Sequence, residues 1–260
     1  MQLGEAGMIA LVVAYLLSSA AEPAVRGQDP ESDWDYAVAE DGTSSVASVG
    51  YSSGFVVSVT CYGGGMINVV MTGLPPVGGD RYSVGATRAD GRTTTVPTAT
   101  LNSGTLSVEY DERIARVMRG GGELTLRLER GQSPPVVVQV DLSEQHTNLD
   151  RVIAQCGRRL EEPRDALPIL VDLQSAPRAS FPPARRARTG SSEWARVEIS
   201  CVVSPETRLE DCQIEHQDGG DSSYGSAVSR AYDGVRVDVT DPTAAAGRVV
   251  YVVVTGATAR

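Results

Sequence analysis

The sequence predicts an α+β fold: a mainly-β, sandwich-like N-terminal domain with two short helices, followed by a small β-β-α-β domain. Between residues 34 and 140, β-branched runs recur at short intervals and are separated by Gly, Pro, Asp or Ser, as in a sandwich or barrel. A stretch rich in Pro, Arg and Ser then interrupts this pattern, and further strands with one helix follow it. The chain has 260 residues, 41% of them hydrophobic and 22% charged, which is typical of a globular protein.

These changes of pattern divide the chain into five segments. In order, we expect a signal peptide at 1–21, a tether at 22–33, the mainly-β domain at 34–165, a Pro/Arg-rich linker at 166–192 and the β-β-α-β domain at 193–260. The linker lacks apolar periodicity, so we expect proteases to cut there first.

The N-terminal segment has the layout of a secretory signal. Met8–Leu17 is apolar, and Ser19 and Ala21 would satisfy a small-x-small cleavage site. The apolar run is shorter than the roughly 20 residues of a membrane span, so we expect no stable span after processing. Glu5 stands where a signal normally carries positive charge, which leaves an uncleaved anchor as the alternative.

The net charge of −10 and the pI of about 4.8 argue against nucleic acid or an anionic membrane surface as the main partner, because basic patches bind both. The chain contains no Lys, so all 23 of its basic residues are Arg.

Within the mainly-β domain, Phe55–Cys61 and Met66–Leu74 are β-branched runs on either side of a Gly-rich gap, which predicts a hairpin. Two helices are expected at Asp111–Gly121 and Thr147–Gly157, because each has apolar residues at helical spacing and stops at Gly. Cys156 falls on the apolar face of the second helix. Further strands are expected at 81–88, 105–110, 122–130 and 135–142.

The C-terminal part begins with two alternating runs, 196–203 and 209–216, around the turn sequence "SPET". A two-residue turn at Glu206–Thr207 would place Cys201 directly opposite Cys212 on antiparallel strands, close enough for a disulfide. A helix is then expected at Ser222–Asp233, and strands at 235–239 and 247–257.

No catalytic residue, cofactor or metal site is expected. The even number of cysteines fits an oxidising compartment, and the absence of any C-x2-C or H-x3-H pair favours disulfides over zinc. His146 lies beside a predicted helix start, while His216 and Glu215 are strand neighbours that should point to opposite faces. The sequence also lacks a G-x-S-x-G nucleophile motif.

The C-terminal part resembles the TonB C-terminal domain family, in the disulfide-bearing form of exported alphaproteobacterial proteins. The matching stretches are "VEISCVVSPETRLEDCQIEH", "YGSAVSRA" and "GRVVYVVV". The chain departs from the family pattern in three places: it lacks the turn Gly, it has Tyr224 for the common Phe, and "VRVDVTDPT" replaces an Arg-Pro step.

The first domain is similar to β-rich exported proteins of the invasion-associated locus B type. The similarity rests on "RIARVMRGGGELTLRLER" followed by "VVVQVDL" and a helix. This resemblance implies that Cys61 and Cys156 are disulfide partners, just as Cys201 and Cys212 are expected to be.

The TonB resemblance implies a non-catalytic periplasmic protein whose C-terminal domain engages an envelope or outer-membrane protein by adding a strand at a sheet edge. The last strand is the candidate edge, although it would also suit a sheet interior. The alternatives are an unidentified periplasmic enzyme, or a membrane-anchored energy transducer if the N-terminal segment is not cleaved. The candidate edge residues are Val249, Val250, Tyr251, Val252, Val253 and Val254.

Overall fold

The computed structural model describes residues 25–26, 34–63, 65–74, 81–102, 104–108, 111–130, 133–170, 173–181 and 194–257. The predicted signal peptide, most of the tether and the end of the predicted linker lie outside these ranges. No helix in the described part of the chain is long and apolar enough to cross a membrane.

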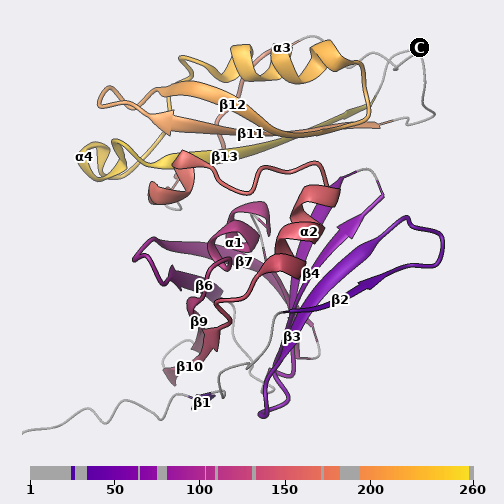
Figure 1. Ribbon diagram of the computed structural model, residues 1–260. Coiled ribbons are helices and arrows are strands. Elements are labelled where there is room, and N and C mark those ends of the chain that lie inside the picture. The colour runs from indigo at the N-terminus through magenta and orange to yellow at the C-terminus, as the bar shows by residue number, and fades with distance from the viewer. Residues whose placement is uncertain are drawn as a thin grey trace, which may run out of the picture.

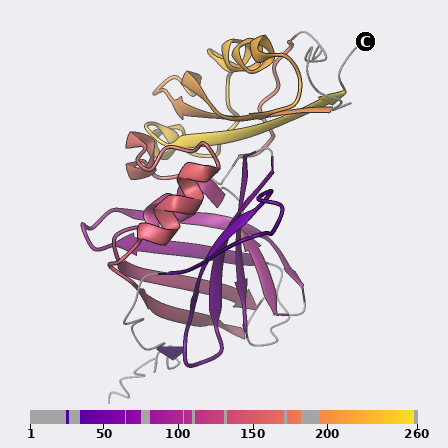
Figure 2. The same ribbon diagram turned by 45° about the vertical axis from the view of Figure 1, so that its right-hand side comes forward.

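The mainly-β domain is one ten-stranded sheet that folds over itself, so that its two halves cross (Figures 1 and 2). All neighbouring strands are antiparallel except the short β1, which pairs with β10 in parallel. The α+β, mainly-β prediction is confirmed, and the order across the sheet is β1-β10-β9-β6-β7-β8-β5-β4-β3-β2. The strands are β1 (Val25–Arg26), β2 (Asp35–Val38), β3 (Ser45–Gly50), β4 (Val56–Tyr62), β5 (Met66–Thr72), β6 (Arg81–Arg88), β7 (Thr93–Asn102), β8 (Thr105–Val108), β9 (Gly122–Arg130) and β10 (Ser133–Leu142).

Strict alternation along the strands builds the core of this domain. In β4, Val57, Val59 and Cys61 point inward, while the residues between them are partly exposed. Two helices, α1 (Asp111–Val117) and α2 (Thr147–Gln155), lie at one end of the sheet (Figure 1). The disulfide between Cys61 and Cys156 ties β4 to the end of α2, with a Cα–Cα distance of 5.5 Å, as the sequence predicted.

The C-terminal part is a three-stranded antiparallel sheet in the order β12-β11-β13, with one long helix on its outer face (Figure 1). Its inner face turns toward the mainly-β domain. On the outer face, β-branched residues of the sheet pack with Tyr224 and Val228 of the helix and form a second core. The elements are β11 (Trp194–Val203), β12 (Leu209–Asp218), α3 (Ser222–Tyr232), α4 (Pro242–Ala245) and β13 (Val249–Ala257).

One prediction for this part is wrong, and one short helix was missed. Residues 235–239 form no strand. Only isolated bridges involve them, between Arg208 and Arg236 and between Leu173 and Val239. The helix α4 was not predicted, because four residues are too few to show helical periodicity.

The hairpin between β11 and β12 does not have the predicted two-residue turn. Ser204 N–H donates to Arg208 O and Thr207 N–H donates to Ser204 O, so a tight turn is followed by one left-handed residue, Thr207, at φ 58°. Asp211 at φ 51° then forms a bulge that corrects the register. The Cys201–Cys212 disulfide forms across this bulge, as predicted, with a Cα–Cα distance of 4.1 Å.

The described part of the predicted linker packs against the C-terminal part. The 3-10 helix η1 (Pro163–Ala166) leads into it. Ile169 and Leu170 follow and are both buried, Ile169 in the core of the mainly-β domain and Leu170 in that of the C-terminal part. Farther along, the Phe181 ring lies 6.2 Å from the ring centroids of both Tyr224 and Tyr232. The two predicted domains are therefore connected by a docked segment over residues 166–170 and 173–181.

Candidate binding edge and inter-domain cleft

The strand β13 lies at an edge of its sheet, paired with β11 on one side. At its start, Val249 N–H donates to Pro168 O and Val249 O accepts from Leu170 N–H, both at 2.9 Å, so the backbone of Val249 faces away from β11. In an antiparallel ladder, successive residues direct their backbone groups to opposite sides. The backbone groups of Tyr251, Val253 and Thr255 therefore point outward in the same way.

The opposite edge, β12, is covered by side chains and by a loop. Arg158 Nη1 donates to Glu215 O at 2.9 Å, Ser229 Oγ donates to Cys212 O at 2.7 Å, and Arg164 donates to Asp211 O. The start of β12 is bonded to the loop after α3 through Leu209 N–H and Val235 O. Within the part of the chain that the structure describes, no hydrogen bond is recorded for the outward backbone groups of Val253 and Thr255, so β13 is the more open of the two edges.

The six candidate edge residues divide between the two faces of the sheet. Val250, Val252 and Val254 belong to the core under α3. The other three face the mainly-β domain: Val249 is fully buried, Tyr251 packs on the core of that domain, and Val253 is 47% exposed.

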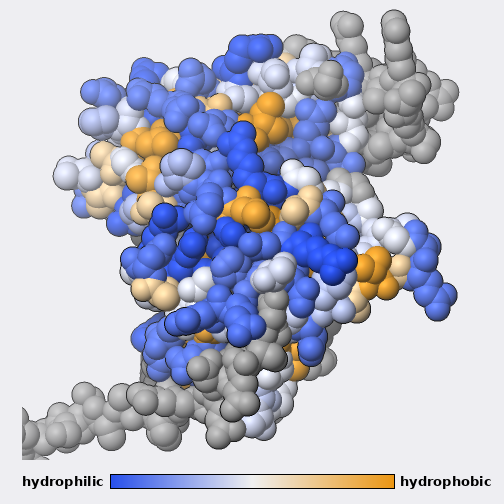
Figure 3. Space-filling model, viewed as in Figure 1, coloured by the Kyte–Doolittle hydropathy of each residue, from blue (hydrophilic) through white to orange (hydrophobic). Residues whose placement is uncertain are grey.

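A cleft of about 470 Å³ lies beside this second face, between the two parts of the chain. On the face seen in Figure 3, the surface where the two parts meet is largely hydrophilic, with a small hydrophobic area within it. The mainly-β domain contributes Met66 and Glu112, among others, to the walls of the cleft. The C-terminal sheet contributes Arg196, Glu198, His216, Tyr251 and Val253.

Arginine side chains join the two parts around this cleft. Arg158 Nε lies 2.9 Å from a carboxylate oxygen of Glu112, and the same side chain donates to Gly65 O of the mainly-β domain and to Glu215 O of β12. Arg164 of η1 donates to both Ser200 O and Ser200 Oγ, at 2.6 and 2.7 Å. A single residue type thus supplies the charge that holds the sheet on the mainly-β domain.

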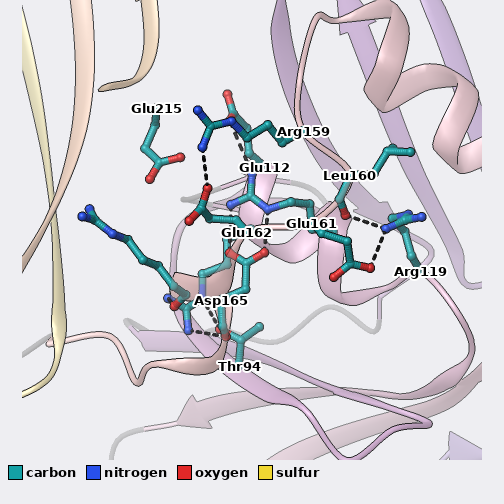
Figure 4. Close-up of polar contacts among 12 residues, drawn as sticks. Thr94, Glu112, Arg119, Arg159, Leu160, Glu161, Glu162, Asp165 and Glu215 are labelled. Carbon is teal, nitrogen blue, oxygen red and sulfur yellow. Dashed lines mark hydrogen bonds and ion pairs between the residues drawn. The ribbon is translucent and has the colours of Figure 1, made fainter. Parts of the chain in front are cut away.

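A second group of ion pairs supports the first from within the mainly-β domain. The buried Arg116 donates twice to the Asp165 carboxylate, at 2.6 and 2.8 Å. Arg116 also lies 3.7 Å from a carboxylate oxygen of Glu112, and Arg159 is paired with Glu162 at 3.1 Å (Figure 4). This arrangement positions η1 and therefore Arg164.

Burial changes the protonation of the groups that line the cleft. It raises the pKa of Glu112 to about 7, although Arg158 lowers that pKa, and it also raises the pKa of Glu198. It lowers the pKa of His216 to about 4, so this imidazole is neutral at pH 7. The cleft therefore combines a neutral imidazole with two carboxylates that are incompletely solvated.

The structure corrects the predicted orientation of His216 relative to its neighbour Glu215. A β-bulge on β12 pairs Glu198 with His216 but Ile199 with Ile214, so Glu215 is the extra residue. As a result, Glu215 and His216 both face the mainly-β domain, and the predicted opposite orientation is wrong. The other histidine, at the start of α2, contacts an Asp carboxylate one turn later. Among the described residues, no group of three His, Cys, Asp or Glu side chains is placed to hold a metal ion.

Sequence reasoning missed Glu112, Arg158 and Glu198 as cleft residues. A signal was present in β11, where polar Arg196, Glu198 and Ser200 alternate with buried apolar residues. Such alternation normally indicates one solvent-facing side of a sheet. Here the polar side is buried against arginines of the other domain, and one strand alone could not indicate this.

Comparisons with known proteins find no matching family model, no matching curated protein and no matching solved structure.

The opposed pKa shifts of Glu112 and His216 predict an unusual pH dependence of stability. An unfolded chain would titrate Glu112 near 4.5 and His216 near 6.5. Between those values the folded protein binds the extra proton at Glu112, which lowers stability as pH rises, and the unfolded chain binds the extra proton at His216, which raises stability. The two effects oppose each other in the wild type, each being at most about 3 kcal/mol.

Single variants separate the two effects. In His216→Gln, the free energy of unfolding should fall from pH 4.5 to pH 7, with Glu198 adding to the decrease. In Glu112→Gln, it should rise between pH 4.5 and pH 6.5. Urea unfolding at a series of pH values measures both slopes. If stability rises with pH in the His216→Gln variant, the burial argument for Glu112 is wrong.

Proposed function

We propose that the protein binds an extended segment of a partner polypeptide, which adds as a fourth strand beside β13. The observation that carries the proposal is the outward direction of the Val253 and Thr255 backbone groups, beyond the point where Val249 is bonded on the same side to Pro168 and Leu170. Such edges bind peptides through the main chain, with side-chain pockets supplying specificity. The cleft lies directly beside these residues.

We also propose that the C-terminal part is a TonB C-terminal-like domain, that the protein acts in the periplasm, and that its partner is an envelope or outer-membrane protein. The element order β11-β12-α3-β13, interrupted only by the four-residue α4, and the Cys201–Cys212 disulfide support the TonB likeness. The Cys61–Cys156 disulfide supports the likeness of the first domain to the invasion-associated locus B type. Both disulfides fit an oxidising compartment.

One observation favours an enzyme as the second candidate. Glu112 lies in a cleft and has a pKa of about 7, the range of a general acid or base. The two candidates differ in what they require of this residue. Strand addition at β13 uses main-chain groups, so Glu112→Gln should retain peptide binding, whereas an acid–base reaction in the cleft would be lost.

Two neighbouring proline substitutions provide a matched test of strand addition. Val253→Pro removes an outward N–H and replaces a side chain that is 47% exposed, so the fold should remain while peptide binding is lost. Val252→Pro removes an N–H that faces β11 and disturbs a buried residue, so the C-terminal part should unfold. Circular dichroism measures the fold, and titration with a synthetic peptide of alternating Thr and Val measures binding.

Hydrogen exchange locates the bound peptide. In the free protein, the amides of Val253 and Thr255 should exchange fast and those of Val250 and Val252 slowly. Added peptide should protect the first two selectively. A folded Val253→Pro variant that binds the peptide as tightly as the wild type would show that β13 is not the binding edge.

A further inference from the structure

A row of side chains crosses the inner face of the C-terminal sheet and ends at the open edge. In register, His216 of β12 lies opposite Glu198 of β11, and Glu198 lies opposite Val253 of β13. Side chains of directly opposed residues stand on the same face of a sheet and contact each other. All three of these residues line the cleft.

An added strand would extend this row by one position. The residue of the partner opposite Val253 would send its side chain to the same face, and therefore into the cleft. The partner residue would be two strands, or about 10 Å, from Glu198. Val253 lies between them, and because its side chain is short and exposed, it leaves a path to the Glu198 carboxylate. A long side chain could cover Val253 with its methylene groups and reach Glu198 with its polar end.

The charges around this path favour a cation. The nearest recorded cation to the Glu198 carboxylate is Arg196, whose Nη2 lies at 3.8 Å, and the Glu198 side chain is only 15% exposed. The other arginine of the cleft, Arg158, is held 2.9 Å from Glu112, and His216 is neutral at pH 7. Glu198 is therefore a largely buried carboxylate whose recorded ion pair is a long one, with an arginine that is itself 41% exposed.

Arg196 can leave Glu198 without losing all of its electrostatic support. Its side chain is 41% exposed, and Asp218 lies opposite it on β12. We infer, on the basis of the proposed function, that the cleft selects a partner segment with a Lys or Arg side chain opposite Val253, which pairs with Glu198. An acidic side chain at the same position would meet the carboxylates of both Glu198 and Glu112.

Three synthetic peptides test this inference on the full-length protein. They share a host sequence of alternating Thr and Val and differ only at one central position, which is Lys, Thr or Glu. The Lys peptide should bind about tenfold more tightly than the Thr peptide, and the Glu peptide more weakly than both, as expected for a charge-assisted contact. A fourth peptide, with Lys moved by one residue to the opposite face, should lose the preference.

Variants of the protein assign the preference to Glu198. Glu198→Gln should remove the tenfold preference for Lys and leave binding of the Thr peptide unchanged, whereas Arg196→Gln should strengthen the preference. Glu210→Gln is the matched control, because it removes the same charge at an exposed position of β12 and should change nothing. Thermal unfolding of each variant verifies that the fold is retained.

The outcomes separate the two proposals. If no peptide binds to the wild type, strand addition fails. If all peptides bind equally and Val253→Pro abolishes binding, strand addition holds and the selection of a basic side chain is wrong. Sedimentation of the free protein tests whether a second copy of the chain occupies the edge, and a stable dimer through β13 would also overturn the inference.

Discussion

Removal of the Cys61–Cys156 disulfide by replacing both residues with Ala is expected to lower the free energy of unfolding by about 4–5 kcal/mol. The bridge joins residues 95 positions apart, so it reduces the conformational entropy of the unfolded chain over most of the mainly-β domain. It also holds the end of α2 against β4, close to Arg158 and therefore to the inter-domain contacts. Equilibrium urea unfolding of the double variant and the wild type measures the difference.

The second disulfide provides the matched comparison. Cys201 and Cys212 are separated by 11 positions, so their replacement by Ala should cost less, about 3 kcal/mol, by the same chain-entropy argument. A loss at Cys201–Cys212 as large as that at Cys61–Cys156 would show that loop length does not determine the stabilisation by these bridges.

The substitution Asp165→Asn is expected to destabilise the protein by about 3–5 kcal/mol. The guanidinium of Arg116, whose side chain is only 4% exposed, would lose its close carboxylate partner and keep only that of Glu112, at 3.7 Å. The substitution would also disturb η1, where Arg113 donates to the carbonyl oxygens of Arg164 and Asp165 at 3.3 and 3.0 Å. The domain contacts made by Arg164 should weaken at the same time.

Two controls test whether the loss comes from a buried charge that has lost its close partner. The double variant Arg116→Met with Asp165→Leu removes both charges and should be clearly more stable than Asp165→Asn. Arg92→Gln removes an exposed partner of Glu161 and should change stability little. The interpretation fails if the double variant is as unstable as the single one.

The parts of the fold that could be predicted from the sequence depend on local pattern. Alternating β-branched residues gave the correct strands around Val57 and Val69, and the spacing of Leu149, Val152 and Ile153 gave α2, because each pattern has only one buried face. The Cys201–Cys212 pairing could also be predicted, because the two residues lie on consecutive strands of one hairpin.

The remaining features depend on contacts between distant segments. The stretch 235–239 alternates as a strand would, but the loop it belongs to meets the start of β12 only through isolated contacts such as that of Arg236 with Arg208. The bulge at Glu215 and the left-handed Thr207 shift the register of β12, and neither position has a Gly to indicate it. The cleft requires the relative placement of α1 and β11, which no local pattern encodes.

The absence of Lys gives the inter-domain contacts a particular chemical property. An ammonium group loses its proton near pH 10.4, whereas a guanidinium stays charged beyond pH 12. The pair of Arg116 with Asp165, which supports these contacts, therefore keeps its charge in alkaline solution, in which a lysine-based pair would be neutralised. Reagents that acylate amines likewise find no side chain to modify, so they leave every cationic contact between the two parts of the chain intact.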